Sequence, residues 1–416
     1  MKRITEVLEI PSYNTKIRVV DHMALLVAEN GNGKTALLNE IAHGTYKYSS
    51  QIDAVYHIGF EKNCSSAKEL LIKARIRTGD ELFNYIKPYT PEPVLRMLES
   101  RIQYEKLTSG VVDDGFAWRR LVLIALLRAW KHERYMLLID EPELMTHPLM
   151  RAEMAAMLKQ IRSEGNPVII ATNLDNIVED LVSSPEQIVR LETVDQKVRI
   201  NQIDLDSLEQ KVKDFYHSDV MLMRRFSGEK QTYNGLKNVV EQNYANYIAS
   251  TLKKDLFDIS FARNIVMGEG ASEGVLFDYA KDGLYPEWIR KHRVTFISCL
   301  GKATMPLFFL FFNELGIPVV CMTDYDNSTN RVHNAYRNSF NRYEKEHPSL
   351  FRHMELNPDL EGHLKIDPPY KLEPIEKPVN VYVNTYATGK ATNDVLGLMR
   401  DWFMMIEEME KANEHN

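Results

Sequence analysis

Short apolar runs alternate with helical patterns over roughly the first 200 residues of the chain. Runs rich in β-branched residues predict strands at Ile17–Val20, Met23–Val27, Ala54–Ile58, Met136–Ile139, Val168–Thr172, Ile188–Leu191 and Val198–Ile203. Helical patterns begin at Gly33, near Glu92, near Phe116 and at Pro148. This order predicts an α/β sheet with a helical insertion over about 65–105.

A second alternation of the same kind fills the last part of the chain. Its predicted strands are Ile265–Met267, Val294–Ile297, Val319–Thr323, His353–Leu356 and Val379–Val383. Between the two alternations, apolar residues recur at helical spacing, which predicts a helical connector, a dimerisation element or a plain spacer. The expected domains are 1–203, 204–257 and 258–416, the last ending in an amphipathic helix over 393–411 that packs on its own domain.

Composition narrows the class of protein only slightly. A chain of 416 residues that is 44% apolar and 26% charged fits two or three globular domains. A net charge of −7 argues against a basic protein that coats nucleic acid, although a local basic groove is compatible with it. Three separated cysteines, no secretory signal pattern and no apolar run long enough to span a bilayer predict a cytoplasmic protein without a membrane partner.

A glycine-rich loop follows the predicted strand Met23–Val27 and opens a helix; it contains Asn30, Gly31, Asn32, Gly33, Lys34 and Thr35. Glycines let backbone N–H groups converge on a phosphate, and a helix N-terminus favours negative charge. The Lys would reach the β- and γ-phosphates, and the Thr hydroxyl would bind Mg²⁺. A chance glycine-rich turn is the alternative, but the strand–loop–helix context favours an ATP site.

The second half of such a site is an acid at the end of a neighbouring buried strand. The predicted strand Met136–Ile139 is followed directly by Asp140 and Glu141. Asp140 would hold Mg²⁺ through water, and Glu141 would orient or deprotonate the attacking water.

Acidic residues also gather at predicted strand ends in the second alternation: Glu269, Glu273, Asp324, Asp326 and Glu361. Glu269 and Glu273 would share one face at the start of a helix, and Asp324 and Asp326 would alternate toward one side. Neighbouring carboxylates repel unless a cation lies between them, and hard oxygen ligands suit Mg²⁺ or Mn²⁺. The pattern therefore predicts a divalent metal site.

The motif Asp140-Glu141-Pro142-Glu143-Leu144, followed by His147-Pro148, resembles ABC-type ATPases of the SMC group, and most closely the OLD (overcoming lysogenisation defect) family. The resemblance implies a homodimer or higher oligomer in which two ATPase heads sandwich ATP. It also implies that Ser109 contacts the γ-phosphate of the opposite head. Asn173 stands where the family usually has a switch His; an Asn can hydrogen-bond a phosphate but cannot take up a proton, so hydrolysis is expected to be slow.

The acidic set resembles the Toprim domain of topoisomerases, primases and OLD-family nucleases. Glu269-Gly270 is similar to the Toprim Glu-Gly turn, and Asp324-Tyr325-Asp326 to its Asp-x-Asp. The OLD resemblance also implies roles for Glu273, Glu361 and Lys390. In that family a pair of metal ions and a Lys serve phosphodiester cleavage, so Glu269, Asp324 and Lys390 are the expected catalytic residues.

The two resemblances together imply an ATP-binding nuclease that cleaves DNA in defence against phage, with a partner such as a reverse transcriptase and its non-coding RNA in retrons. An ATP-gated sensor or scaffold without cleavage, and a nuclease acting on RNA or tRNA, remain alternatives. Basic residues interleave with Tyr336, Phe340 and Tyr343 after the Asp-x-Asp motif. They are typical either of a nucleic-acid groove or of a solvated helix with its aromatic residues in the core.

Overall fold

The structure is a computed structural model of the whole chain. It describes residues 4–29, 31–59, 63–99, 102, 104, 107, 116–142, 148–173, 181–194, 197–218, 222, 232–252, 255–325, 331–366, 372–373, 375–390 and 392–414. The chain divides into two compact units, residues 1–202 with 254–260 and residues 203–253 with 261–416. Most of the predicted connector over 204–257 is therefore part of the second unit and not a domain of its own.

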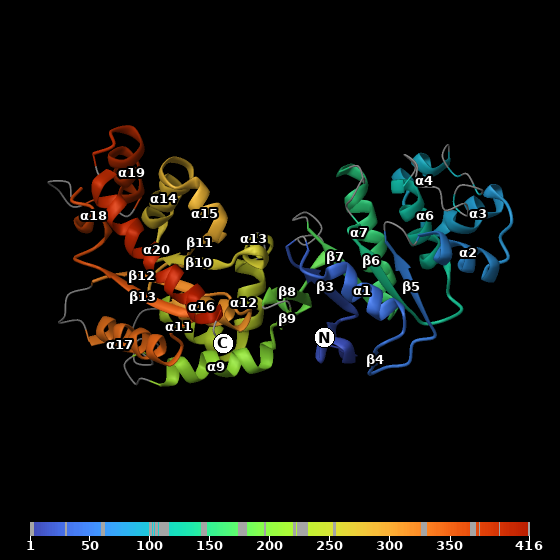
Figure 1. Ribbon diagram of the computed structural model, residues 1–416, viewed down its shortest axis with the longest axis horizontal. Helices are drawn as coiled ribbons and strands as arrows, with labels where there is room; N and C mark the ends of the chain where they lie inside the picture. Colours follow the sequence, from blue (N-terminus) through green and yellow to red (C-terminus); the bar gives the residue numbers. More distant parts are fainter. Residues whose placement is uncertain are drawn as a thin grey trace. The chain divides into compact units, whose positions relative to one another are not determined.

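The first unit contains a mixed parallel and antiparallel sheet in the order β4-β1-β2-β3-β7-β6-β5, with β8 pairing β3 and β9 (Figure 1). Its strands are β1 (Thr5–Ile10), β2 (Thr15–Val20), β3 (Met23–Val27), β4 (Lys47–Tyr48), β5 (Ala54–Ile58), β6 (Tyr135–Asp140), β7 (Val168–Thr172), β8 (Ile188–Val194) and β9 (Lys197–Gln202). Strands β3, β7, β6 and β5 are parallel, so their carboxyl ends meet at one edge. The sequence did not predict β1 and β4.

The helices of this unit are α1 (Lys34–Ala42), α2 (Asn63–Lys73), α3 (Gly79–Ile86), α4 (Glu92–Glu99), α6 (Phe116–Ala129), α7 (Pro148–Ser163) and most of α13 (Leu256–Phe261), within the described residues. Helices α3 and α4 contact α6. Helices α2, α3 and α4 occupy the segment predicted as a helical insertion. Leu37, Leu38 and Ile41 of α1 join a core with side chains of the sheet, including Leu26 and Leu138. This packing holds the start of α1 beneath the carboxyl ends of β3 and β6.

The second unit has a four-stranded parallel sheet in the order β11-β10-β12-β13, within the part of the chain that the structure describes. Its strands are β10 (Asn264–Gly268), β11 (Val294–Ser298), β12 (Val319–Asp324) and β13 (Phe351–Leu356). Each overlaps a strand predicted from the sequence. The central strands β10 and β12 consist almost entirely of buried residues, as expected for a sheet covered by helices on both faces.

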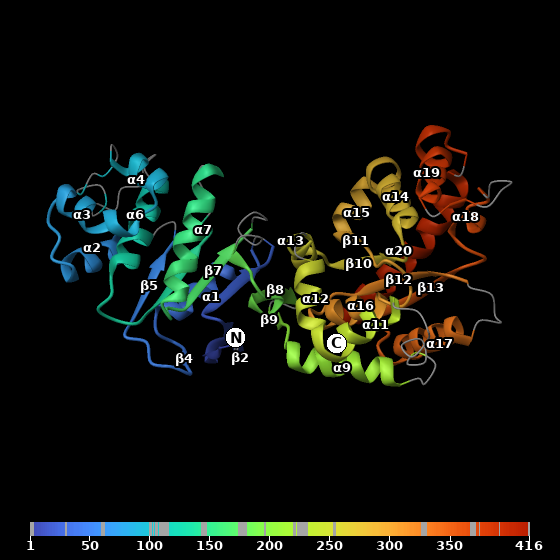
Figure 2. The same ribbon diagram turned by 180° about the vertical axis from the view of Figure 1, so that it is seen from behind.

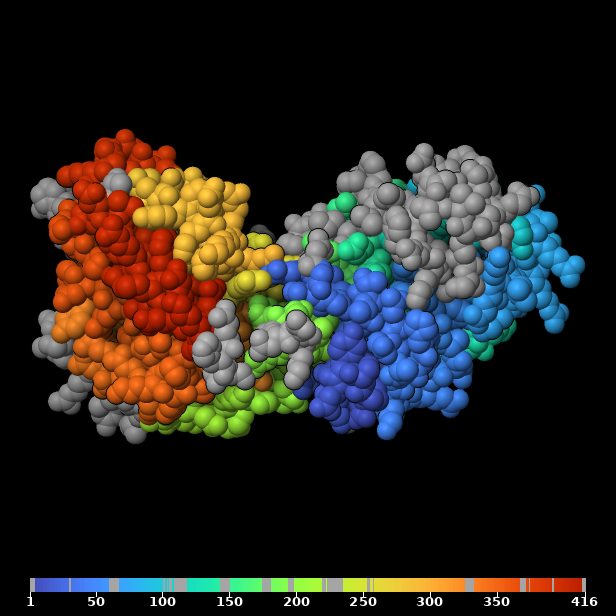
Figure 3. All heavy atoms as spheres, in the orientation of Figure 1, coloured from blue at the N-terminus to red at the C-terminus, as the bar shows by residue number. Residues whose placement is uncertain are grey.

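One face of this sheet packs against helices near the top of Figure 1. These are α14 (Ala271–Tyr279), α15 (Pro286–His292), α18 (Leu360–His363), α19 (Glu376–Tyr382) and the long α20 (Thr392–Glu414), with π-helical turns at Ala280–Leu284 and Val383–Ala387. Trp402, Ile406 and Met409 of α20 join the core, which confirms that the C-terminal helix packs on its own unit. Figure 3 shows the surface of α20 beside that of α14 and α15.

The opposite face packs against α9 (Leu205–His217), α12 (Tyr244–Thr251), α16 (Met305–Glu314) and α17 (Arg331–Glu346), as Figure 2 shows from behind. Helix α11 (Thr232–Asn238) and a π-helical turn at Val239–Asn243 precede α12. Phe340 and Tyr343 of α17 contact Phe215 and Phe309. Tyr336 and Phe340 are buried in the core and the half-buried Tyr343 packs against it, which favours the interpretation of a helix with its aromatic residues in the core.

The prediction of a strand at Val379–Val383 is wrong, because α19 and the following π-helical turn occupy this segment. Pro378 lies in the first turn of α19, where a proline does not interrupt a helix. Val381 and Thr385 are buried four residues apart, a helical spacing, whereas Val379 and Val383 are exposed. None of the described helices combines the length and the apolar character that crossing a membrane requires.

Candidate functional site

The glycine-rich loop of the first unit has the backbone that a phosphate-binding loop needs. Gly31 and Gly33 have φ angles of 87° and 83°, in the left-handed region that favours glycine. The Lys34 ammonium donates to the carbonyl oxygens of Ala28 and Glu29 at 2.7 and 3.3 Å. A phosphate could replace these carbonyls as the acceptor. Asn32 lies in the turn of the loop, and Asn30 is outside the described residues.

Thr35 and Asp140 lie together, as predicted for the two halves of a nucleotide site. The Thr35 hydroxyl donates to Asp140 Oδ2 at 2.7 Å. Asp140 is only 9% exposed, and its Oδ1 has no hydrogen-bond partner among the described residues. A buried carboxylate oxygen without a partner is costly, so the pair fits a Mg²⁺ ion.

Glu141 is held from three sides. Its backbone lies in the left-handed region with φ 46°, and its N–H donates to the Ala171 carbonyl at 2.7 Å. Arg120 donates to its carbonyl oxygen, and Asn173 Nδ2 donates to its carboxylate Oε1 at 2.6 Å. The structure thus brings Asn173 to Glu141, while Ser109 lies outside the described residues. A strained backbone fixed in this way is common where a side chain must be aimed.

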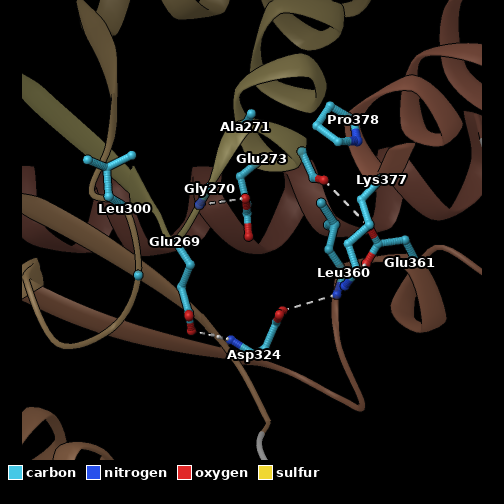
Figure 4. A pocket seen from close by; sticks show the side chains of 12 residues that line it. Glu269, Gly270, Ala271, Glu273, Leu300, Asp324, Leu360, Glu361, Lys377 and Pro378 are labelled. Carbon is cyan, nitrogen blue, oxygen red and sulfur yellow. Dashed lines mark hydrogen bonds and ion pairs between the residues drawn. The ribbon is translucent and has the colours of Figure 1, made fainter. Parts of the chain in front are cut away.

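The second unit places four predicted acids around one open pocket of about 310 Å³ (Figure 4). They follow the ends of three neighbouring strands: Glu269 and Glu273 after β10, Asp324 at the end of β12, and Glu361 on α18 after β13. This is the edge at which parallel strands gather their carboxyl ends, as predicted. Asp326 lies outside the described residues.

Each of the four carboxylates accepts at least one hydrogen bond. Backbone N–H groups donate to three of them: Asp324 N to Glu269 Oε1 at 3.0 Å, Gly270 N to Glu273 Oε2 at 3.0 Å, and Leu360 N to Asp324 Oδ1 at 3.2 Å. Glu361 accepts from the Ser272 hydroxyl and the Lys377 ammonium. Within the described ranges, no three acidic, His or Cys side chains already surround one ion position. These carboxylates must therefore rearrange slightly, or be joined by further ligands, to bind an ion.

The electrostatics of the pocket fit a divalent cation. Burial raises the pKa of Asp324 to about 8, and the charges of Glu269, Glu273, Asp359 and Glu361 add to the rise. Burial also raises the pKa of Glu273, with further contributions from Glu269 and Glu361. With a pKa of about 8, Asp324 retains its proton at neutral pH unless a cation compensates its charge, and a cation would likewise favour the ionised form of Glu273.

Close packing at Gly268 sets the position of Glu273. A Cβ atom at Gly268 would lie 2.6 Å from the Cβ of Glu273 and 2.9 Å from Cζ of Phe296. Real Cβ atoms do not approach so closely, so a larger residue would displace Glu273 from the pocket wall. The glycine just before the Glu-Gly turn is therefore needed for space.

Lys390, the lysine predicted to serve these acids, is exposed and does not line the pocket. Lys377 of α19 lines it instead, with its ammonium 3.5 Å from Glu361 and 3.9 Å from Asp359. Although burial alone would lower it, the charges of Glu361, Asp359 and Asp324 raise the pKa of Lys377. No local pattern marked Lys377, because the segment that follows it, Val379–Val383, has the pattern of a strand.

The remaining predicted member of the motif, Tyr325, stays outside the acidic pocket. The Arg337 guanidinium lies 4.3 Å from the centre of its ring, a cation–π contact that fixes the residue after Asp324. Tyr325 N–H also donates to the Leu356 carbonyl at 2.7 Å. These contacts give Tyr325 a structural role at the end of β12.

One segment of the second unit is similar to a known domain family. Residues 261–326 match the family model described as overcoming lysogenization defect protein-like, TOPRIM domain, a span that contains Glu269, Glu273 and Asp324. No curated protein matches the chain.

Similar solved structures come from ABC transporters. A chain from an inward-facing metal-chelate type ABC transporter has 16% identity and a TM-score of 0.30, covering 50% of this chain and 88% of that one. The ATP binding subunit of an ABC transporter has 14% identity and a TM-score of 0.30, covering 50% and 93%. These TM-scores are too low to support an argument.

Proposed function

We propose that this chain, whose residues 261–326 match the OLD-like Toprim family, is an ATP-binding endonuclease that depends on Mg²⁺ or Mn²⁺ and cleaves DNA. The observation that carries the proposal is the open pocket lined by four carboxylates from three strand ends. A protein that used this domain only as a scaffold would have no reason to bury mutually repelling acids at one edge of a sheet.

Glu269, Glu273, Asp324 and Glu361 are the described residues that would hold divalent ions. When bound, such ions make a water nucleophilic at neutral pH and stabilise the leaving oxygen. Lys377 faces the same pocket and would neutralise the charge that develops on the phosphate oxygens. We assign to Lys377 the role that the sequence predicted for Lys390.

In the first unit, we propose that Lys34 and the loop backbone bind the phosphates of ATP, while Thr35 and Asp140 hold its Mg²⁺. Glu141 would orient the attacking water, and Asn173 would hold the Glu141 carboxylate in place. Because Asn173 cannot take up a proton at neutral pH, ATP would be turned over slowly and would act chiefly as a conformational ligand. Two ATPase heads would close on the nucleotide as a homodimer, which a shift in elution volume with ATP would test.

Cleavage is tested with purified protein, supercoiled plasmid and either Mg²⁺ or Mn²⁺. We expect the wild type to nick or linearise the plasmid and the Asp324→Ala variant to be inactive. Glu346→Ala removes an exposed acid of α17 outside the pocket and should cleave like the wild type. Equal cleavage by the wild type and Asp324→Ala would show that the activity comes from elsewhere and would refute the proposal.

A second pair of variants separates the two candidate lysines. Lys377→Met should lose most of the cleavage activity, because its ammonium lies in the pocket, whereas Lys390→Met should retain it. The opposite result would return the role to Lys390.

The choice of DNA over RNA rests on the family resemblance alone, because this chemistry acts on the phosphate. Parallel digests of plasmid, single-stranded DNA, messenger-like RNA and tRNA would show which is cut. We further propose a role in defence against phage beside a partner such as a reverse transcriptase. Copurification with the products of neighbouring genes would test that role.

A further inference from the structure

Lys302 is buried beneath the acidic pocket, an unusual position for a lysine. Its side chain is only 5% exposed, and it lies in the loop between β11 and α16. Burying an ammonium group is costly unless hydrogen bonds and an opposite charge compensate for the lost water. Its contacts show what compensates it.

The ammonium of Lys302 contacts both strands that carry the pocket acids. It donates to the backbone carbonyl of Asp324 at 2.7 Å and lies 3.6 Å from Glu269 Oε1. Lys302 therefore holds the end of β12 through the Asp324 backbone carbonyl, and it holds Glu269, which follows β10, through charge attraction. Neither contact uses the Asp324 carboxylate, which stays directed to the pocket.

Backbone hydrogen bonds anchor the same loop to β10. Gly301 N–H donates to the Glu269 carbonyl at 2.7 Å, and Cys299 N–H donates to the Gly268 carbonyl at 3.0 Å. The Thr304 hydroxyl donates to the Gly301 carbonyl at 2.9 Å and closes the turn. The loop thus joins the carboxyl ends of β10, β11 and β12, and Lys302 is the link to β12.

We infer that Lys302 is a positioning residue of the metal site: it fixes Glu269 and the Asp324 backbone in the arrangement that receives a divalent ion. This inference rests on the proposed metal-dependent function. Lys302 would not touch the substrate, because its buried ammonium is not among the groups lining the pocket.

Two physical effects of removing Lys302 have opposite signs, and this makes the inference testable. As a positive charge near Glu269, Lys302 repels an incoming cation, so its removal would tighten metal binding if charge alone mattered. Lys302 also orients Glu269 and the end of β12, and this orientation favours metal binding. By this second effect, removing Lys302 would weaken metal binding. Groups that orient metal ligands typically contribute about 10- to 100-fold in affinity.

The experiment is calorimetric titration of the full-length protein with Mn²⁺ alone, without nucleotide or nucleic acid. Lys302→Met should weaken Mn²⁺ binding about tenfold or more. Lys302→Gln keeps a donor that can reach toward the Asp324 carbonyl, and it should recover part of the affinity. Lys365→Met removes an exposed lysine that pairs with Asp394 outside the pocket, and it should bind Mn²⁺ like the wild type.

If Lys302 only stabilised the fold, replacing it would lower the melting temperature without changing the Mn²⁺ affinity. The melting temperature of each variant is therefore measured with and without Mn²⁺, and the increment due to Mn²⁺ should shrink in Lys302→Met. If that variant does not fold, Lys302→Gln decides in its place.

Mn²⁺ affinity that is unchanged or higher in the folded variant would overturn the inference and leave the proposed function standing. A wild type that binds no Mn²⁺ in the second unit would overturn the proposed function as well. The two failures are thus distinguishable in one set of titrations.

Discussion

Replacing Asp324 with Asn should stabilise the metal-free protein, although it removes a proposed catalytic residue. Asn has nearly the same shape, and its side-chain oxygen can still accept the hydrogen bond from Leu360 N–H. What it removes is a negative charge that burial and four neighbouring acids disfavour. In the absence of metal, this charge is a source of instability.

The size of the effect follows from the pKa of Asp324, which rises from 3.8 to about 8 in the folded protein. An acid whose pKa is higher in the folded state lowers stability as pH rises above its unfolded value, by about 1.4 kcal/mol per pH unit. This loss ends near pH 8, where the folded group also ionises. Allowing for partial exposure, the advantage of Asp324→Asn should grow by about 2 to 4 kcal/mol between about pH 5 and pH 8.

The assay is urea unfolding of both proteins at the two pH values with EDTA present. Hydrogen exchange of peptides from β10 and β12 identifies the transition that belongs to the second unit. Adding Mg²⁺ at pH 8 should stabilise the wild type by mass action and have little effect on the variant. Asp394→Asn, an acid outside the pocket, is the matched control.

A variant that gains no more stability at pH 8 than at pH 5 would refute this reasoning. It would mean that Asp324 titrates in the folded protein much as it does in the unfolded chain. The acids would then not be close enough to repel one another, and the argument for a cation in the pocket would fail.

Other predictions concern the same pocket and the nucleotide loop. Mn²⁺ affinity should rise with pH up to about pH 8, approaching tenfold per unit, because Asp324 must lose its proton; a flat calorimetric profile would contradict this. Gly268→Ala should destabilise the protein by about 1 to 3 kcal/mol in urea unfolding and weaken Mn²⁺ binding, because its Cβ would displace Glu273, whereas Gly397→Ala, with open space around it, should not. Lys34→Ala should weaken ATP binding tenfold or more in a nucleotide titration and leave Mn²⁺ binding by the second unit intact; loss of both would contradict two separate sites.

Much of the fold was predictable because its buried strands appear in the sequence as short apolar runs. The predicted strands Met23–Val27, Ala54–Ile58 and Val168–Thr172 have the bounds that the structure gives them. Parallel strands covered by helices form continuous apolar runs, which a single sequence displays clearly. The first strands, β1 and β4, are less apolar and pair antiparallel at the sheet edge, so their patterns are weaker.

The segment Val379–Val383 shows where local pattern fails. Its alternation of valines with polar or aromatic residues favours a strand, but the helix buries only Val381 of this stretch. Tertiary packing against α14 decides the outcome, and a single sequence does not display that packing. The error also concealed Lys377, because a lysine at the start of a helix beside Glu361 could not be foreseen from a predicted strand.

The sequence predicted which acids lie at the pocket, but it did not predict which lysine lies beside them. Acids at the ends of parallel strands are brought together by the topology itself, so the strand prediction also placed them. Gly-Lys pairs occur at Gly33-Lys34, Gly301-Lys302 and Gly389-Lys390, and nothing local distinguishes which lies near the acids. Lys302 follows a predicted strand of the same sheet, and that position was the available signal.

Lys302 and Lys377 differ in solvent exposure, and this difference indicates different roles in the second unit. Lys302, at 5% exposure, is held between a carbonyl and a carboxylate and cannot reach a nucleic acid without breaking both contacts. Lys377, at 40% exposure, balances Glu361 and Asp359 yet still opens onto the pocket, so an incoming phosphate can exchange with those carboxylates once ions compensate them. Under the proposed function, Lys302 would hold the acids before metal binds, and Lys377 would turn toward the substrate afterwards. The proposed function therefore predicts that metal binds first and nucleic acid second, because Lys377 pairs with Glu361 and Asp359 until ions compensate those acids.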